Sequence, residues 1–378
     1  MNGSGRLAVC GGLVVTPDGA LEADLLVEGE TIEAVEAPAD SHPGRTVIDA
    51  TGCVVLPGAV DVHVHVRMPY VRLDGEVVWS SDGFPGASIA AALGGTTTIV
   101  DFAMQDEGQD LLGPLAERLE FVERSTVDVA LHCWILDPNE RALAQLPELV
   151  ARGVPSVKVF MAYSQLGTPM SDGELYELMQ ATGKAGGLVQ VHAENAGLNA
   201  RAIERARRTS RTGFEHFAAS RPALGEEEAV SRALLFAHAV GTPVYFVHLS
   251  TAAAVRRLAA ARAAGQAAFG ETCPHFLLFD ESRYLGQRAG DFLMAPPLRT
   301  TADRQALWAA LRAGELDVVA TDHSAWPRAV KSYGTGFLES IQGVAGLGLL
   351  LPLLAASDLG WETLARVTAS RPSTPGTC

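Results

Sequence analysis

The chain has 378 residues, 48% of them hydrophobic, and this length suits one large α/β domain or two smaller ones. Its formal net charge of −15 at pH 7 is opposite in sign to that of most nucleic-acid-binding proteins, so no nucleic-acid partner is expected. The most apolar late segment, residues 343–356, is too short and too rich in glycine and proline to cross a membrane, so no membrane association is expected either.

The first 56 residues contain short alternating apolar runs separated by glycine, aspartate and proline. Alternation with a period of two predicts strands joined by turns, so we expect a β-meander here. The opening residues, MNGSGRLAVCGG, lack the basic segment and apolar core of a secretory signal peptide. The five cysteines are widely scattered and form no CxxC pair, which favours a reduced, cytoplasmic location.

From residue 57 onward, short β-branched apolar runs alternate with longer segments rich in alanine, leucine, glutamate and arginine. The runs predict eight strands, and the segments between them predict helices. The expected strands are 59–66, 97–102, 127–134, 156–161, 188–193, 244–248, 267–271 and 317–322. Buried strands joined by helices form parallel sheets, and eight such units make a (β/α)8 TIM barrel. A doubly wound sheet is disfavoured because no GxGxxG turn follows a strand.

Ligand-type side chains recur along these predicted strands, mostly near their ends. They are His63 and His65 in the first strand, Lys158 in the fourth, His192 in the fifth, His248 in the sixth and Asp322 in the eighth. In a (β/α)8 barrel the functional residues gather at the carboxyl ends of the strands. Imidazole and carboxylate groups bind zinc and similar divalent cations. Together, the six residues predict a metal centre.

Two features strengthen this hypothesis. His63 and His65 stand two apart on one strand, so both imidazoles face the same side and can reach one ion. Lys158 stands between two valines, and burial in a barrel would favour its neutral amine, which can add carbon dioxide to form a metal-bridging carbamate. Each residue alone has a structural alternative: the histidines as ordinary core or polar positions, Asp322 as a helix cap, and Lys158 as the partner of a carboxylate.

The sequence also resembles the dihydropyrimidinase/D-hydantoinase group of cyclic amidohydrolases, from about residue 6 to residue 370. The motifs that carry the resemblance are PGAVDVHVH, ALGGTTTIVDF, SVKVFMAY, DGELYELM, VHAEN, SRPALGEEEA, VYFVHLST, GETCPHFLL, APPLR and LWAALRAGELDVVATDH. The resemblance implies a (β/α)8 barrel beside a small β-sandwich formed by both chain ends. It also implies a carboxylated lysine, two divalent metal ions that are usually zinc, a small cyclic amide as substrate, and a homo-oligomer, commonly a tetramer.

The resemblance further implies a role for each residue. One metal would take His63, His65, Asp322 and the Lys158 carbamate, and the other would take His192, His248 and the same carbamate. A hydroxide bridging the metals would attack the substrate carbonyl. Asp322 would serve as general base and then as general acid. Tyr163 would stabilise the oxyanion, with a packed barrel tyrosine as the alternative.

Several positions leave the ring substrate open. Arg67 matches an arginine with which dihydroorotases hold a substrate carboxylate, but it could equally pair with Asp74 or Glu76. Ala295 stands where hydantoinases often have a ring-contacting serine, whereas allantoinases and dihydroorotases often have alanine. DHS at 322–324 and IQGVAGLG at 341–348 favour allantoinase, while VFMAY, SRPALGEEEA and GETCPHF favour hydantoinase. We therefore predict hydrolysis of a hydantoin or dihydropyrimidine ring, with allantoinase or dihydroorotase-like activity as the alternative.

The predicted organisation is part of a β-sandwich at 1–56, a metal-dependent hydrolase barrel at 57–370, and a tail at 371–378. Related chains continue further, whereas this tail is rich in proline, serine and threonine, so a disordered or truncated end is expected. The sandwich should then be incomplete, with exposed strand edges. A non-catalytic scaffold, as in the collapsin response mediator proteins, is a further alternative that the complete ligand set disfavours.

Overall fold

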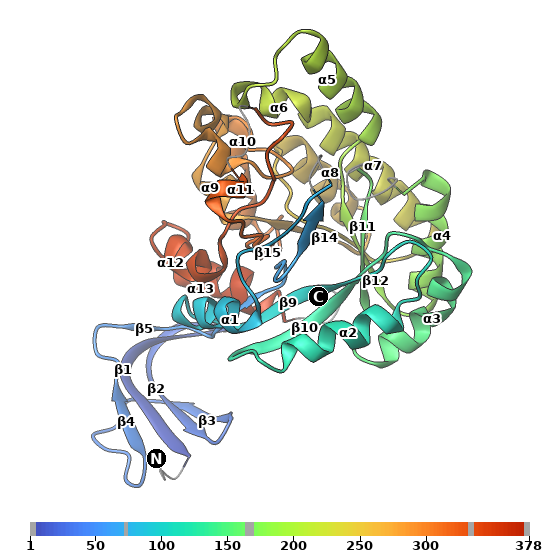
Figure 1. Ribbon diagram of the computed structural model, residues 1–378. Helices are drawn as coiled ribbons and strands as arrows, with labels where there is room; N and C mark the ends of the chain where they lie inside the picture. Colours follow the sequence, from blue (N-terminus) through green and yellow to red (C-terminus); the bar gives the residue numbers. More distant parts are fainter. Residues whose placement is uncertain (1–4, 72–74, 163–169, 332–335, 374–378) are drawn as a thin grey trace.

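The computed structural model describes residues 5–71, 75–162, 170–331 and 336–373. Figure 1 shows two parts: a small sheet formed by the N-terminal strands, and a larger barrel of strands surrounded by helices. Helix α13 (Trp361–Ala365) contacts strands of the small sheet, so the late part of the chain links the two parts.

The N-terminal sheet contains β1 (Arg6–Thr16), β2 (Gly19–Glu28), β3 (Thr31–Glu36), β4 (Thr46–Asp49) and β5 (Val54–Val55). The β1–β2 and β2–β3 pairs are antiparallel, as a meander requires. The meander prediction is wrong for β4 and β5, which both pair with β1 in parallel. Parallel pairing requires a crossover connection, and residues 37–45 carry the chain back across the sheet to make it.

The edges of this sheet are exposed. Strands β3 and β4 lie at the two ends of the order β3-β2-β1-β4, and every residue of β4 is exposed. The apolar side chains of Ile32, Val47 and Ile48 are exposed on these edge strands. Within the described ranges, α13 packs against β1 and β2, and no second sheet covers them.

Eight parallel strands form the barrel and confirm the predicted (β/α)8 fold class. In spatial order they are β6 (Ala59–Asp61), β9 (Thr96–Met104), β10 (Asp128–Trp134), β11 (Ser156–Phe160), β12 (Leu188–His192), β13 (Val244–Phe246), β14 (Ala268–Thr272) and β15 (Val318–Val319). Each predicted strand corresponds to one observed strand, but the first and the last are much shorter than predicted. The residues that follow β6 and β15 were predicted to continue these strands, but they lie outside the regular backbone ladder.

Helices cover the outside of the barrel (Figure 1). They are α1 (Phe84–Leu93), α2 (Leu112–Val122), α3 (Glu140–Ala151), α4 (Asp172–Lys184), α5 (Ala196–Arg208), α6 (Phe217–Ser220), α7 (Ala223–Val240), α8 (Ala252–Ala263), α9 (Pro274–Leu278), α10 (Thr301–Ala313), α11 (Arg328–Lys331) and α12 (Leu350–Ala355). A short hairpin of β7 (Pro69–Val71) and β8 (Val77–Trp79) follows the first barrel strand. None of the helices in the described ranges has the length and apolarity needed to span a membrane.

The barrel closes at a seam between the segments that follow β6 and β15. Val64 and His323 form an isolated parallel bridge there. The backbone amide of His65 donates to the His323 carbonyl at 2.7 Å, and the His323 amide donates to the His63 carbonyl at 3.3 Å. These bonds place the predicted ligands of the first strand directly beside the segment that carries Asp322.

Asp61 is buried in the same seam. Its carboxylate accepts hydrogen bonds from the Thr321 amide at 3.0 Å and from the Thr321 hydroxyl at 2.6 Å. Burial raises the pKa of Asp61 to about 7, although both hydrogen bonds lower it. The seam is therefore held by an isolated backbone bridge and by side-chain hydrogen bonds, whereas neighbouring strands elsewhere in the barrel are joined by backbone ladders.

Candidate metal centre

All six predicted ligands line one pocket at the carboxyl ends of the barrel strands. They are His63, His65, Lys158, His192, His248 and Asp322. The other described lining residues are Met68, Tyr70, Trp134, Phe160, Met294, Ala295, Ser324, Gln342 and Gly343. The space that these residues surround, including a part open to solvent, is about 690 Å³.

Three of these ligands converge on one position. The Nε2 atoms of His63 and His65 each lie 3.3 Å from Oδ1 of Asp322. Asp322 has a φ of 48°, a left-handed backbone conformation that is uncommon outside glycine and often found at functional sites. Burial raises the pKa of Asp322, but the imidazoles of His63 and His65 have the larger opposite effect. Together they hold the pKa of this carboxyl well below its usual value. An ionised carboxylate and two imidazoles are suitable ligands for one divalent cation.

His192 and His248 form the second group. Nδ1 of His192 lies 2.9 Å from Nε2 of His248. Burial lowers the pKa of both residues, so both are neutral, which is the form that binds metal. His248 has a φ of 41°, and its Nδ1 atom is buried without a hydrogen-bond partner among the described residues.

Lys158 lies close enough to both groups to affect them, because burial, together with the charge of this lysine, lowers the pKa values of His63, His192 and His248. It is fully buried, and its Nζ atom lies 3.4 Å from Nε2 of His63. Burial lowers the pKa of Lys158 to about 8, although the charges of Asp322 and Glu271 raise it. A much larger share of neutral amine is therefore present near neutral pH than in an exposed lysine, and carbamate formation requires that form.

Glu271 orients two of the histidines, and it was not among the residues predicted from the sequence. Its Oε1 atom lies 2.8 Å from Nδ1 of His63 and accepts the backbone amide of His248 at 3.1 Å. Its Oε2 atom accepts the hydroxyl of Tyr245 at 2.9 Å. Metal-binding histidines usually donate their second ring nitrogen to such a carboxylate. The available sequence signal was its place at the end of the seventh predicted strand.

We expect Glu271→Gln to weaken metal binding about 10–100-fold, because the amide no longer holds His63 in the required tautomer and orientation. Chelator competition measures the affinity directly. Glu315→Gln, which changes an exposed glutamate, is the matched control. Equal affinities of the two variants would show that Glu271 has no orienting role.

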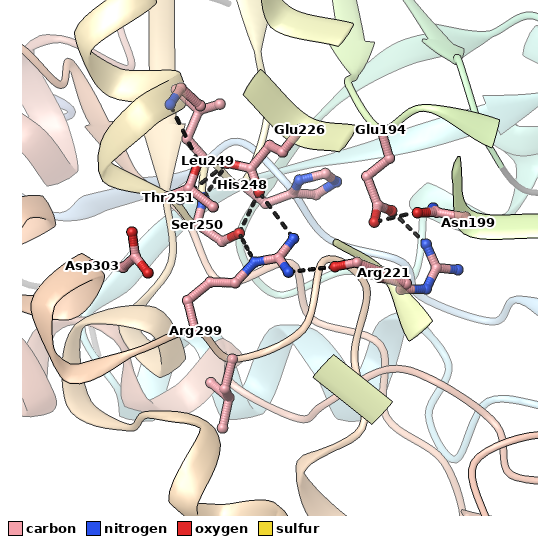
Figure 2. Close-up of polar contacts among 12 residues, drawn as sticks. Glu194, Asn199, Arg221, Glu226, His248, Leu249, Ser250, Thr251, Arg299 and Asp303 are labelled. Atoms are coloured by element: carbon pink, nitrogen blue, oxygen red, sulfur yellow. Dashed lines mark hydrogen bonds and ion pairs between the residues drawn. The ribbon is translucent and has the colours of Figure 1, made fainter. Parts of the chain in front are cut away.

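A second carboxylate holds His192. Oε2 of Glu194 lies 2.7 Å from Nε2 of His192. It also accepts a hydrogen bond from Arg221 at 2.5 Å (Figure 2). Burial raises the pKa of Glu194, but Arg221 and His192 lower it to about 2, so it is ionised. The Arg221 carbonyl in turn accepts Nη1 of Arg299 at 2.5 Å.

Glu226 fixes the segment that follows His248. It accepts the backbone amides of Ser250 at 2.9 Å and Thr251 at 3.0 Å. Arg299 lies 3.5 Å from the same carboxylate and donates to the Ser250 hydroxyl at 3.1 Å (Figure 2). The buried pair of Glu226 and Arg299 therefore supports the backbone segment that follows His248.

Lys331 joins two walls of the pocket. Its Nζ atom donates to the carbonyl of Leu293 at 2.8 Å and to the carbonyl of Gly343. Burial lowers its pKa to about 7. Gln342 and Gly343 line the pocket beside this contact. Both belong to the IQGVAGLG segment, which indicated a substrate class in the sequence but was not predicted to line the site.

The three remaining predicted residues have different outcomes. Ala295 lines the pocket, and its contact with a substrate stays a prediction. Arg67 is not among the described lining residues, so its position gives no support to a contact with a substrate carboxylate. It is exposed, and its guanidinium lies 3.9 Å from the ring centre of Phe121 and 5.2 Å from that of Trp79. Tyr163 lies outside the described residues.

The comparisons with known proteins agree with this geometry. Residues 54–347 match the model described as the amidohydrolase family. The chain is 36% identical to a D-hydantoinase from Streptomyces coelicolor over 327 residues, which cover 85% of this chain and 69% of that protein. It is also 36% identical to a D-hydantoinase from Geobacillus stearothermophilus over 340 residues, 87% of this chain and 70% of that one. The structure of a dihydropyrimidinase from Brevibacillus agri NCHU1002 is similar, with a TM-score of 0.90, 31% identity, and coverage of 97% of this chain and 81% of that one.

Proposed function

This chain belongs to the amidohydrolase family, and from that membership we propose that it hydrolyses the cyclic amide bond of a hydantoin or dihydropyrimidine ring. The observation that carries the proposal is the convergence of all six ligand-type side chains in one pocket. The family match and the named relatives make the chain a hydrolase of cyclic amides.

The donor set fits two divalent cations, and we assign zinc because imidazole and carboxylate ligands suit it. One ion would be held by His63, His65 and Asp322, and the other by His192 and His248, with the carboxylated Lys158 between them. When bound, the metals would polarise the substrate carbonyl and supply a bridging hydroxide near neutral pH.

The protein groups would then bind the ring and move the proton. Asp322 is ionised, so it can accept the proton of the attacking water and return it to the departing ring nitrogen. Trp134 and Phe160, whose rings stack with centres 4.6 Å apart, and Met294 add apolar lining to the pocket, which suits an apolar substituent on the ring.

The pocket favours a neutral ring over a carboxylated one. Lys158, which is assigned to the metals, is the only lysine or arginine among the described lining residues. Among these described residues a dihydroorotate carboxylate would find no cationic side chain besides Lys158, which weighs against the dihydroorotase-like alternative. Allantoin has no carboxylate, so this argument does not bear on the allantoinase alternative. The assay described next tests that alternative.

A metal-reconstituted assay against dihydrouracil, 5-substituted hydantoins, allantoin and dihydroorotate tests the proposal. We expect turnover of the first two substrates. Preferred turnover of allantoin or dihydroorotate would support the alternative activities. A protein that binds its metals and hydrolyses none of the four would contradict the catalytic assignment and favour the scaffold.

We expect Tyr163→Phe to lower kcat about 10²-fold, because the hydroxyl that stabilises the oxyanion is lost. The metal content should stay unchanged. Steady-state kinetics with metal analysis measures both quantities, and Tyr176→Phe on an exposed face of α4 is the matched control. A rate equal to that of the control would assign Tyr163 to packing.

We also propose a cytoplasmic homo-oligomer. Cys10, Cys53, Cys133 and Cys273 are free thiols, which supports a reducing compartment. The tetramer is carried over from the family resemblance, and light scattering of the purified protein measures the state directly.

A further inference from the structure

A second cluster of ligand-type side chains lies in the N-terminal sheet, outside the barrel. Ligand atoms of Cys10, Asp24 and His42 lie within 4.8 Å of one another. Cys10 belongs to β1, Asp24 belongs to β2, and His42 belongs to the connection between β3 and β4. The family match begins at residue 54, so it does not include these residues.

A β-bulge brings Cys10 beside Asp24. The register between β1 and β2 shifts here, so that Cys10 and Gly11 together oppose Asp24 alone. Gly11 has a φ of 74°, which glycine adopts without strain, and its amide donates to Oδ1 of Asp24 at 3.1 Å. Such bulges redirect side chains, and this one places a thiol against a buried carboxylate.

His42 completes the cluster from the crossover connection. Its Nε2 atom lies 2.7 Å from Oδ2 of Asp24, and its side chain is only 7% exposed. Its other nitrogen, Nδ1, lies 3.8 Å from a carboxylate oxygen of the half-exposed Glu36, which is beyond hydrogen-bond distance. The contact with Asp24 therefore fixes the imidazole in the cluster.

Asp24 is the buried centre of the cluster. Hydrogen bonds from the Ala39 amide and from His42 lower the pKa of Asp24, so this buried carboxylate is ionised. Burial raises the pKa of the Cys10 thiol, and Asp24 and Asp49 raise it further. A divalent cation placed among the three ligand atoms, which lie within 4.8 Å of one another, would displace the thiol proton.

We propose that Cys10, Asp24 and His42 bind one divalent cation of the zinc type, with water as the fourth ligand. Thiolate, imidazole and carboxylate are the ligands that zinc takes in proteins, and they suit calcium or magnesium less well. The ion would tie the 37–45 connection to both strands. A cross-link of this kind would stabilise a sheet that has no second sheet packed on it in the described ranges.

Cobalt(II) substitution of the full chain tests this site separately from the barrel. A cobalt–thiolate bond gives a near-ultraviolet charge-transfer band, and the ligands proposed for the barrel centre include no cysteine. We expect the wild-type protein to show the band. Cys10→Ser should lose the band and about one metal equivalent while it keeps its hydrolase activity. Cys53→Ser, which changes an exposed cysteine near the same sheet, should keep both the band and the metal.

His42→Gln provides a second variant that leaves the thiol in place. It should lose the same metal equivalent, and zinc should raise Tm in the wild-type protein but not in this variant, with circular dichroism as the check of folding. A band that persists in Cys10→Ser, or a metal content that neither variant changes, would overturn the proposal. Either result would leave the barrel assignment untouched, because activity and barrel metals are measured in the same samples.

Discussion

Asp322→Asn is expected to lower kcat about 10²–10⁴-fold. The amide is isosteric, but it removes the charge that completes the set with His63 and His65, whose Nε2 atoms lie 3.3 Å away. It also removes the group that accepts and returns the proton. Steady-state kinetics on a 5-substituted hydantoin, combined with metal analysis, separates the loss of metal from the loss of proton transfer.

Asp106→Asn is the matched control, because Asp106 is exposed. It should behave as the wild-type protein does. If Asp322→Asn kept full activity with its metals bound, Asp322 would be neither the general base nor an essential ligand.

Lys158→Ala should remove bound metal from both positions. In the proposed binuclear centre the carboxylated side chain is a ligand of both ions, so its loss would deprive each ion of an anionic ligand. The metals contribute several kcal/mol to transition-state stabilisation, so kcat should fall about 10³-fold or more. Metal analysis by mass spectrometry and the hydrolysis assay measure the two losses.

Lys184→Ala is the control for this change, since Lys184 is exposed in the last turn of α4. A second measurement tests the carbamate itself: the wild-type protein equilibrated with ¹³C-labelled carbon dioxide should show a carbamate carbon resonance that Lys158→Ala lacks. Two tightly bound metal equivalents in Lys158→Ala would exclude the bridging role.

The positions of the six candidate ligands could be predicted because they depend on local pattern. Buried parallel strands appear in sequence as short apolar runs, and the carboxyl ends of all eight strands meet at one face of the barrel. A polar residue at the end of such a run therefore has a predictable location before any contact is known. The same pattern gave the eight strands, although not the lengths of the first and the last.

The residues that support those ligands could not be predicted in this way. Glu271 contacts His63 across 208 positions of sequence, and only the closed barrel brings them together. Features outside the ligand set were also not predictable. Arg67, which follows the first barrel strand, has a positive φ of 49°, a conformation that the sequence does not indicate for an arginine. Cys10 and Asp24 meet through a bulge whose register the alternating pattern of the strands does not specify.

A metal ion bound at the seam beside β6 and β15 would couple the chemistry of this protein to its persistence in the cell. Three candidate ligands lie on the two segments that close the barrel, so an ion held by them would join the first and last strands as well as activate water. Any ligand that binds only the native state adds its binding free energy to that of folding. The apoprotein would then open first at this seam, exposing its interior to proteases, and scarcity of metal would determine how much enzyme survives as well as how much of it is active.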